Sequence, residues 1–533
     1  MSEGAVTQYD LICVGSGIGG CAAAAAAASA GASVLILEKT DQVGGVTTYS
    51  LGQFWLPATR LSKELGIEDS IEDGIEYISA LAGEWGDREL TVNLLSKANE
   101  ALEYFEDQHG LSLRVDPTLP DYYYGRVPHG SLSGRYLEPN PIDPRTLGDW
   151  QDKLRLCPTQ LIDAGPDPDE GERSRGDAHI DGGEALAAYF LRAAINSGAE
   201  IWTESRVVGL QTEQGRVVGV QIDGPKGQRS VAARRGVVLA TGGYDWNPEL
   251  VSRFEGALDP ASSASPPGID GDHLSLATRL GAAITALPPS RNVMFLGYAT
   301  DEADVDGHQR HLPHFPAVAS PHEIIVNRAG ERFADEWFYP SLATAIQTFD
   351  GDRHTYPNWP AWHIFDETNM QSRQRLGLRM PPADAMVSAD SLEELASLVG
   401  IKPSGLVGSV GRFNGSCDRG SDPDFGRGEV AWSRAVAGLG STSEPSGAAL
   451  GRIEKAPYYA AALSRVQLGV PSAGLEINEN AQAVTLTGDP IPGLYAVGNA
   501  SGRNDLGVCL QSGIPNTRGM VYGYLAARHA MRV

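Results

Sequence analysis

A short loop near the C-terminus combines a thiol, an amide and bare backbone. The stretch GVCLQSGIP, residues 507–515, places Cys509 and Gln511 between Gly507 and Gly513. An amide is a strong hydrogen-bond donor and a thiol is a weak one, and glycine allows backbone N–H groups to approach a ligand closely. No basic residue in LGVCLQSG would lower the pKa of Cys509, so a thiolate nucleophile is not favoured. The loop is therefore suited to contacting a ligand, whose nature depends on the rest of the chain.

The stretch that identifies one ligand lies at the other end of the sequence. In YDLICVGSGIGGCAAAAAAASAGASVLILEK, residues 9–39, a predicted strand over 11–14 precedes Gly15, Gly17 and Gly20. An alanine-rich predicted helix and a second predicted strand over 33–37 follow, and Glu38 ends that strand. This order is typical of a dinucleotide-binding βαβ unit, in which the helix N-terminus stabilises a pyrophosphate and the acidic residue binds ribose hydroxyls.

Composition excludes several other classes of protein. The 533 residues include 67 acidic and 42 basic ones, a net charge of −25, which disfavours nucleic acid and anionic membranes as partners. Five cysteines without a CxxC pair indicate neither a disulfide framework nor a zinc knuckle. The first ten residues contain no basic segment, and no apolar run is long enough to span a membrane. We expect a cytoplasmic enzyme without an integral membrane segment.

Three further segments favour FAD over NAD, because they resemble flavoprotein motifs. KTDQVGGVTTYS resembles the second glycine pair of flavoproteins, GVVLATGGYDWNP the turn that closes the nucleotide domain, and IPGLYAVGNASG the late turn that reaches the flavin. The additional cofactor residues are Lys39, Gly44, Gly45, Thr241, Gly242, Gly498 and Asn499. The expected fold is α/β: a discontinuous Rossmann-like FAD-binding domain over residues 1–284 and 453–533, interrupted by an α+β capping domain over 285–452. We expect the FAD to be bound non-covalently.

The order of these segments resembles the fumarate reductase and succinate dehydrogenase flavoprotein superfamily, which carries a segment similar to NRAGERFADE in its capping domain. Within it, three stretches resemble the 3-ketosteroid dehydrogenases: YSLGQFWLP (49–57), LPDYYYGRVPHGSLSGRYLEP (119–139) and APYYAAALSRVQLGVPSAGL (456–475). The resemblance implies dehydrogenation of a cyclic ketone, a 3-ketosteroid or smaller, at its α and β carbons. A proton would leave the α carbon and a hydride would pass to flavin N5.

The resemblance also implies roles for individual residues. It makes Tyr339 the base and Tyr122 its hydrogen-bond support, with Tyr459 as a further candidate. It places the ketone oxygen at the backbone N–H of Gly513. A tyrosine that shares this task in the family falls on Cys509 here, so the sequence departs from the pattern, and Gln511 becomes the alternative donor.

Other interpretations stay open. A reductase of the fumarate or urocanate type would need an arginine proton donor at or next to Cys509, where there is none. A redox-silent FAD-binding protein is a further alternative. Arg503 and Arg518 could each meet a substrate carboxylate, the flavin phosphates or a surface partner. The histidines of HQRHLPH (His308, His311 and His314) are expected to be polar loop residues, and no metal site is predicted.

Overall fold

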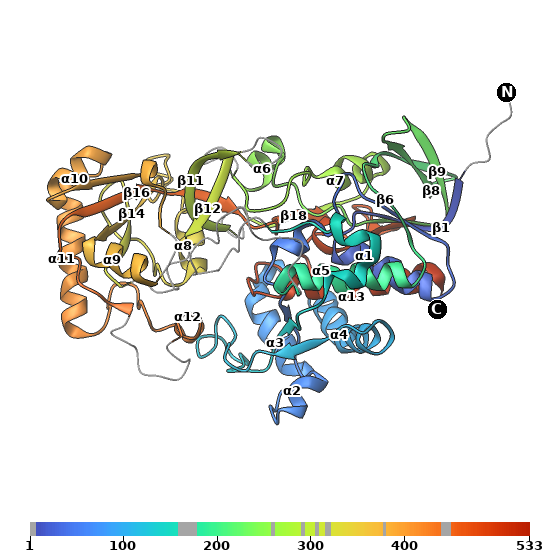
Figure 1. Ribbon diagram of the computed structural model, residues 1–533, viewed down its shortest axis with the longest axis horizontal. Coiled ribbons are helices and arrows are strands. Elements are labelled where there is room, and N and C mark those ends of the chain that lie inside the picture. Colours follow the sequence, from blue (N-terminus) through green and yellow to red (C-terminus); the bar gives the residue numbers. More distant parts are fainter. Residues whose placement is uncertain are drawn as a thin grey trace.

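The computed structural model describes residues 7–157, 179–256, 262–288, 294–303, 309–314, 321–376, 380–438 and 449–532. Two lobes are visible in Figure 1, with β1 and α13 in one and α10 and α11 at the far end of the other. Among the helices of these residues, none combines the length and the apolar character needed to cross a bilayer.

One large sheet, built from both ends of the chain, forms the base of the nucleotide domain. It contains β1 (Thr7–Val14), β2 (Val34–Leu37), β6 (Glu200–Trp202), β7 (Arg206–Glu213), β8 (Arg216–Asp223), β9 (Arg229–Leu239), β19 (Gln482–Val484) and β20 (Pro490–Ala496). The order is β19-β20-β9-β1-β2-β6, and β8 and β7 extend from β9. Because β1 pairs in parallel with β2 and β9, and β20 in parallel with β9, the core of the sheet is doubly wound.

The βαβ unit predicted for residues 9–39 is confirmed. Its helix, α1 (Ile18–Ser29), connects β1 to β2, and β1 begins at Thr7 rather than Leu11. Seven consecutive alanines make α1 narrow, and nearly all of its residues are buried. It packs against α5 (Gly182–Asn196) and against the C-terminal helix α13 (Ile514–Met531). Figure 1 shows these three helices together beneath the sheet.

The chain segment that connects β2 to β6 forms a mostly helical layer. Its elements are η1 (Gly45–Tyr49), β3 (Phe54–Trp55), α2 (Arg60–Glu64), α3 (Ile71–Ala82), α4 (Arg88–His109), β4 (Leu113–Val115) and β5 (Tyr136–Pro139). After β9 come α6 (Pro248–Phe254), α7 (Asp272–Ala277) and β10 (Ile284–Ala286), the last of which pairs with β18 (Ala473–Leu475). These elements bring residues from both ends of the chain to one side of the sheet.

The capping domain is a separate α+β unit with two small antiparallel sheets. Its strands are β11 (Met294–Ala303), β12 (Gln309–His314), β13 (Glu323–Asn327), β14 (Ala361–Asp366), β15 (Met386–Ala389), β16 (Tyr458–Ala462) and β17 (Ser464–Gln467). Its helices are α8 (Tyr339–Ala345), α9 (Glu367–Leu376), α10 (Leu392–Val399), α11 (Pro403–Arg419) and α12 (Ala431–Val436). The strand orders are β12-β11-β17 and β13-β14-β16-β15.

The strand pairing bears on where the insertion ends. Both β16 and β17 lie after residue 452, yet β16 pairs with β14 and β15, and β17 pairs with β11. We therefore infer that the chain returns to the nucleotide domain near residue 468 rather than at 453.

Candidate active site

A single elongated cavity joins the two domains. One end is lined by the loop after β1, by Glu38 at the end of β2 and by Thr241. The other end is lined by Tyr122, Tyr339 and the C-terminal loop. The structure thus brings the predicted nucleotide site and the predicted catalytic residues into one continuous space.

The first end of this cavity is formed by the start of α1. Gly15 has φ +110°, and a Cβ there would lie 2.3 Å from the carbonyl oxygen of Ala240, so the turn requires glycine. Gly17 is the N-cap residue of α1 and offers no capping side chain; the N–H of Ile18 donates to the Thr47 hydroxyl at 3.1 Å, and the positive end of the helix favours an anion beside it.

Glu38 is held in a fixed position beside this turn. Its Oε2 accepts hydrogen bonds from the hydroxyl of Ser16 at 2.6 Å and from the backbone N–H of the same residue at 3.2 Å. Its Oε1 accepts from the backbone N–H of Thr40 at 3.0 Å. A carboxylate oriented in this way, 8 % exposed at the cavity wall, is suited to accepting hydrogen bonds from ribose hydroxyls.

The predicted cofactor residues reach the cavity with two exceptions, Gly20 and Gly44. Those that line it are Gly15, Gly17, Glu38, Lys39, Gly45, Thr241, Gly242, Gly498 and Asn499. Gly44 stands just behind the wall, where its N–H donates to the Ser16 hydroxyl at 3.0 Å. Gly20 lies within α1, where a Cβ would meet the carbonyl oxygen of Gly15 at 2.0 Å. The ammonium group of Lys39 bonds to Asp270 and Asp272, both at 2.8 Å.

Two tyrosines meet at the opposite end of the cavity. The hydroxyl of Tyr339, the first residue of α8, donates to the hydroxyl of Tyr122 at 3.2 Å. Both side chains are buried, with 7 % and 4 % of their surface exposed. Tyr339 is followed by Pro340, which is compatible with the first turn of a helix because the N–H it lacks would have no helical partner.

Aromatic rings of the capping domain pack against this pair. The ring of Tyr339 lies 4.6 Å from Phe295 on β11 and 6.1 Å from Trp432 on α12, measured between centroids. The ring of Tyr122 lies 4.3 Å from Trp432. No sequence motif pointed to Phe295 or Trp432, because their contact with the tyrosines depends on how the cap packs against the nucleotide domain.

Burial determines the protonation of both phenols. It raises the pKa of Tyr122 to about 12, although hydrogen bonds with Tyr339 and Ser512 oppose this shift. Burial also raises the pKa of Tyr339 well above its ordinary value, an effect that the charge of Arg503 partly offsets. Both hydroxyls are therefore neutral near pH 7, and Tyr339 can accept a proton only in the minor fraction of molecules in which it has lost its own proton to solvent.

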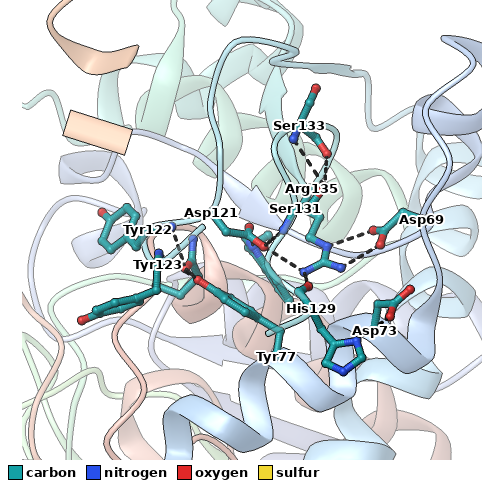
Figure 2. A network of polar contacts seen from close by, with 12 residues as sticks. Asp69, Asp73, Tyr77, Asp121, Tyr122, Tyr123, His129, Ser131, Ser133 and Arg135 are labelled. Atoms are coloured by element: carbon teal, nitrogen blue, oxygen red, sulfur yellow. Dashed lines mark hydrogen bonds and ion pairs between the residues drawn. The ribbon is translucent and has the colours of Figure 1, made fainter. Parts of the chain in front are cut away.

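A buried ionic network holds the loop that carries Tyr122 (Figure 2). Arg135 binds Asp69 through Nη2 at 2.7 Å and Asp121 through Nη1 at 2.8 Å. Asp121 also accepts from the indole N–H of Trp55 at 2.7 Å. All three charged side chains are at most 4 % exposed. Because Asp121 precedes Tyr122 directly, this network fixes the position of the tyrosine.

Gly513 occupies the start of the long C-terminal helix and lines the cavity. It is the N-cap residue of α13 with φ +83°, and a Cβ would lie 2.5 Å from the backbone carbonyl carbon of Phe54. The N-terminal end of a helix carries partial positive charge. This position is suited to stabilising a negative charge that develops on a ketone oxygen.

The thiol and the amide of the same loop differ in what they contact. Burial raises the pKa of Cys509 to about 12, so its side chain is a neutral body in the cavity wall. The amide of Gln511 accepts from the hydroxyl of Tyr77 at 3.0 Å and donates to the hydroxyl of Tyr136. Its oxygen also accepts from the backbone N–H of Tyr122 at 3.4 Å. The amide therefore anchors the tyrosine loop while lining the cavity.

The two arginines of this region are both buried, so the surface ion pair considered from the sequence is wrong for each. Arg518 is paired with Asp505, with Nε at 2.7 and 3.0 Å from the two carboxylate oxygens. Arg503 lines the cavity, and its Nη2 donates to the backbone oxygen of Cys509.

Other candidates lie away from the cavity. The hydroxyl of Tyr459 donates to Glu367 at 2.7 Å. His308 lies outside the described residues. His314 is on β12 and buried rather than in a polar loop, so that expectation was wrong, and it meets Glu323 and His363. Three such side chains can hold a metal ion, but the Glu323 carboxylate already binds the guanidinium of Arg373 at 3.0 Å.

Comparison with known proteins agrees with this geometry. A family model described as "FAD binding domain" matches residues 10–510. The chain belongs to this FAD-binding family. The flavoprotein is 32 % identical to 4-oxocyclohexanecarboxylate 2-dehydrogenase of Sinomonas cyclohexanicum over 98 % of this chain and 92 % of the relative. It is 29 % identical to 3-oxosteroid 1-dehydrogenase of Mycolicibacterium smegmatis, over 98 % of this chain and 96 % of the relative.

A solved structure extends the comparison to the fold. The 3-ketosteroid Δ1-dehydrogenase of Sterolibacterium denitrificans, in complex with 1,4-androstadiene-3,17-dione, superposes with a TM-score of 0.85 at 26 % identity. The match covers 99 % of this flavoprotein and all of that chain. The N-terminus of α1 and the oriented Glu38, which line one cavity, fit FAD. This flavoprotein is an FAD-dependent oxidoreductase of the ketone dehydrogenase type.

Proposed function

We propose that the protein introduces a carbon–carbon double bond between the α and β carbons of a cyclic ketone. The observation that carries this proposal is the hydroxyl pair of Tyr339 and Tyr122, buried at the far end of the FAD cavity and facing a loop that ends in Gly513. A base and an oxyanion donor in the lining of one cavity are what enolisation of a ketone needs.

The residues divide the reaction between them. Tyr339 takes the proton from the α carbon in its deprotonated form, in which the neighbouring hydroxyl of Tyr122, 3.2 Å away, donates to the phenolate oxygen. The backbone N–H of Gly513, at the positive end of α13, stabilises the charge that develops on the ketone oxygen. The electron pair of the α C–H bond becomes the new double bond as a hydride leaves the β carbon. FAD, when bound, supplies the acceptor for that hydride.

The C-terminal loop has Cys509 in place of the tyrosine that would bind the ketone of a steroid. This difference favours a substrate that is smaller than a steroid or differently shaped. Cys509 fills space without serving as a strong donor, and Gln511 holds the loop of Tyr122. The relatives' names include both a steroid and a single carboxylated ring as substrates, so we extend only the shared feature, a cyclic ketone, to this protein. Its electrons would pass from the reduced flavin to a separate acceptor.

Anaerobic mixing of the oxidised holoenzyme with a panel of ketones tests this function. The panel contains 4-oxocyclohexanecarboxylate, the neutral 4-methylcyclohexanone and a 3-ketosteroid. A dehydrogenase bleaches the flavin with a ketone alone and yields the corresponding enone. Reoxidation of dithionite-reduced enzyme by fumarate or urocanate, with no bleaching by any ketone, would instead support a reductase.

A further inference from the structure

Arg503 is a buried cation on the wall of the substrate end of the cavity. It lies in the loop between η8 (Gly498–Ala500) and α13, and 4 % of its surface is exposed. Tyr339, Cys509 and Phe295 line the same cavity. Removing a guanidinium from water is costly unless its charge is met by an anion.

Among the described residues, no carboxylate forms an ion pair with the guanidinium of Arg503. Nη2 donates to the backbone oxygen of Cys509, whereas Nε and Nη1 have no hydrogen-bond partner among the described residues. The nearby carboxylates are occupied. Asp505 binds Arg518 at 2.7 Å, and Glu255 accepts from the hydroxyl of Ser472 at 2.6 Å and from its backbone N–H at 2.8 Å.

Two other buried arginines are neutralised by ion pairs with carboxylates. Arg135 faces Asp69 and Asp121, and Arg332 faces Glu336 at 2.6 Å and Asp422 at 2.8 Å. Each of these guanidiniums has two carboxylate partners. Arg503 has the same burial without such a partner, so its counter-anion has to come from a bound molecule.

The position of Arg503 indicates which molecule this is. Its positive charge opposes the rise in the pKa of Tyr339 that burial causes, and it acts likewise on Cys509. It therefore belongs to the end of the cavity where the proposed base lies. The nucleotide end has its own groups, the N-terminus of α1 for phosphate and Glu38 for ribose. The anion that Arg503 meets is thus on the substrate.

We propose that the substrate is a cyclic ketone that carries a carboxylate, and that Arg503 binds this carboxylate through Nε and Nη1. The inference rests on the proposed function and names its substrate class. Apolar side chains beside Arg503, among them Phe295, Leu506 and Leu510, line the same space and suit a hydrocarbon ring. Arg503 then sets the orientation of the ring, because it fixes one substituent while Tyr339 meets the α carbon.

A binding experiment tests this assignment without requiring turnover. Cyclohexanecarboxylate and cyclohexanecarboxamide, which have the ring but no ketone, are titrated into the oxidised holoenzyme and followed by calorimetry. We expect the carboxylate to bind and the amide to bind at least 10-fold more weakly. Arg503→Gln should weaken carboxylate binding by roughly 100-fold, the scale for losing one partner of a buried charge pair, and change amide binding less than 3-fold.

Controls separate the possible outcomes. Arg60→Gln, which removes a positive charge at a half-exposed surface pair, should leave both affinities unchanged, and Arg503→Lys should restore part of the carboxylate affinity. Equal binding of carboxylate and amide by the wild type would overturn the inference even if Arg503→Gln failed to fold. Loss of FAD from Arg503→Gln would also overturn it, because the partner of Arg503 would then be the cofactor.

The ketone panel distinguishes a failure of this inference from a failure of the proposed function. If the carboxylated and the neutral ring ketone bleach the flavin with the same kcat/KM, the dehydrogenase function stands and the role of Arg503 is wrong. If neither ketone bleaches the flavin while carboxylate binding depends on Arg503, the anion site stands and the function is wrong.

Discussion

Replacing Tyr339 by phenylalanine removes the proposed base with little change in packing. The ring remains available for its contacts with Phe295 and Trp432, at 4.6 and 6.1 Å between centroids. Only the hydroxyl and its 3.2 Å hydrogen bond to Tyr122 are lost. We expect FAD content and the affinity for a carboxylated ketone to stay within about 3-fold of wild type.

The expected loss of rate follows from the role of each hydroxyl. Loss of a general base slows proton transfer by roughly 10²- to 10⁴-fold, so Tyr339→Phe should reduce the flavin at least 100-fold more slowly. Tyr122→Phe leaves the base but removes the hydroxyl that donates to its phenolate oxygen. A hydrogen bond to a charged group contributes about 1.5 to 3 kcal/mol, which corresponds to about 10- to 150-fold in rate. The double variant should be no slower than Tyr339→Phe alone.

Anaerobic stopped-flow measurement of flavin reduction, with substrate concentration varied, separates the rate from the affinity. The wild-type rate should rise from pH 6 to pH 10 without a plateau, because burial raises the pKa of Tyr122 to about 12 and that of Tyr339 well above its ordinary value. If Tyr339→Phe reduces flavin at the wild-type rate, the base is elsewhere. A larger loss in Tyr122→Phe than in Tyr339→Phe would mean that the two roles are exchanged.

Three further predictions concern residues near Tyr339 and Tyr122. Cys509 should resist iodoacetamide at pH 8, because a pKa of about 12 leaves roughly one thiolate in 10⁴. Mass spectrometry should find Cys417 modified first. The rate of flavin reduction in Cys509→Ala should stay within about 5-fold of the wild-type rate. Gln511→Ala should lower the free energy of unfolding by about 1 to 3 kcal/mol, since it leaves two buried hydroxyls without their partner, and a denaturant midpoint equal to that of wild type would contradict this role. Burial raises the pKa of Asp335 to about 7, so the folded protein retains a proton that the unfolded chain loses above about pH 4, and stability from this group falls as the pH rises to 7. Asp335→Asn should therefore raise the melting temperature at pH 8 and have little effect at pH 4; the same increase at both pH values would assign the effect to packing.

The nucleotide site could be predicted from sequence because its determinants are local. Gly15, Gly17 and Glu38 lie within one βαβ unit, and their spacing follows from a turn, a helix start and a strand end. The structure adds the contacts that orient Glu38, but not its location. The loop at 498–513 was equally recognisable, since it follows a buried strand directly.

The substrate end was harder to predict because its residues come from distant segments. Phe295 and Trp432 become neighbours of Tyr339 only through the sheets of the cap. The sequence showed Arg503 as one of two equivalent arginines, and only the pairing of Arg518 with Asp505 separates them. The amide of Gln511 was expected to donate to the ketone, yet it bonds to the hydroxyls of Tyr77 on α3 and Tyr136 on β5 and to the backbone of Tyr122. These hydrogen bonds and ion pairs depend on tertiary contacts, which the spacing of residues in the sequence does not reveal.

The contact of α1 with α13 has a consequence for biosynthesis. The helix α1 is synthesised with a strip of alanines whose partner, α13, lies far later in the sequence, so a large part of the protein must be synthesised before the two can pack. The loop with Gly498, Arg503 and Gly513 is also translated long after the βαβ unit. FAD therefore cannot find its complete site before this loop has left the ribosome. A premature stop before residue 514 would leave the alanine strip exposed, and we expect such fragments to be recognised by chaperones and degraded.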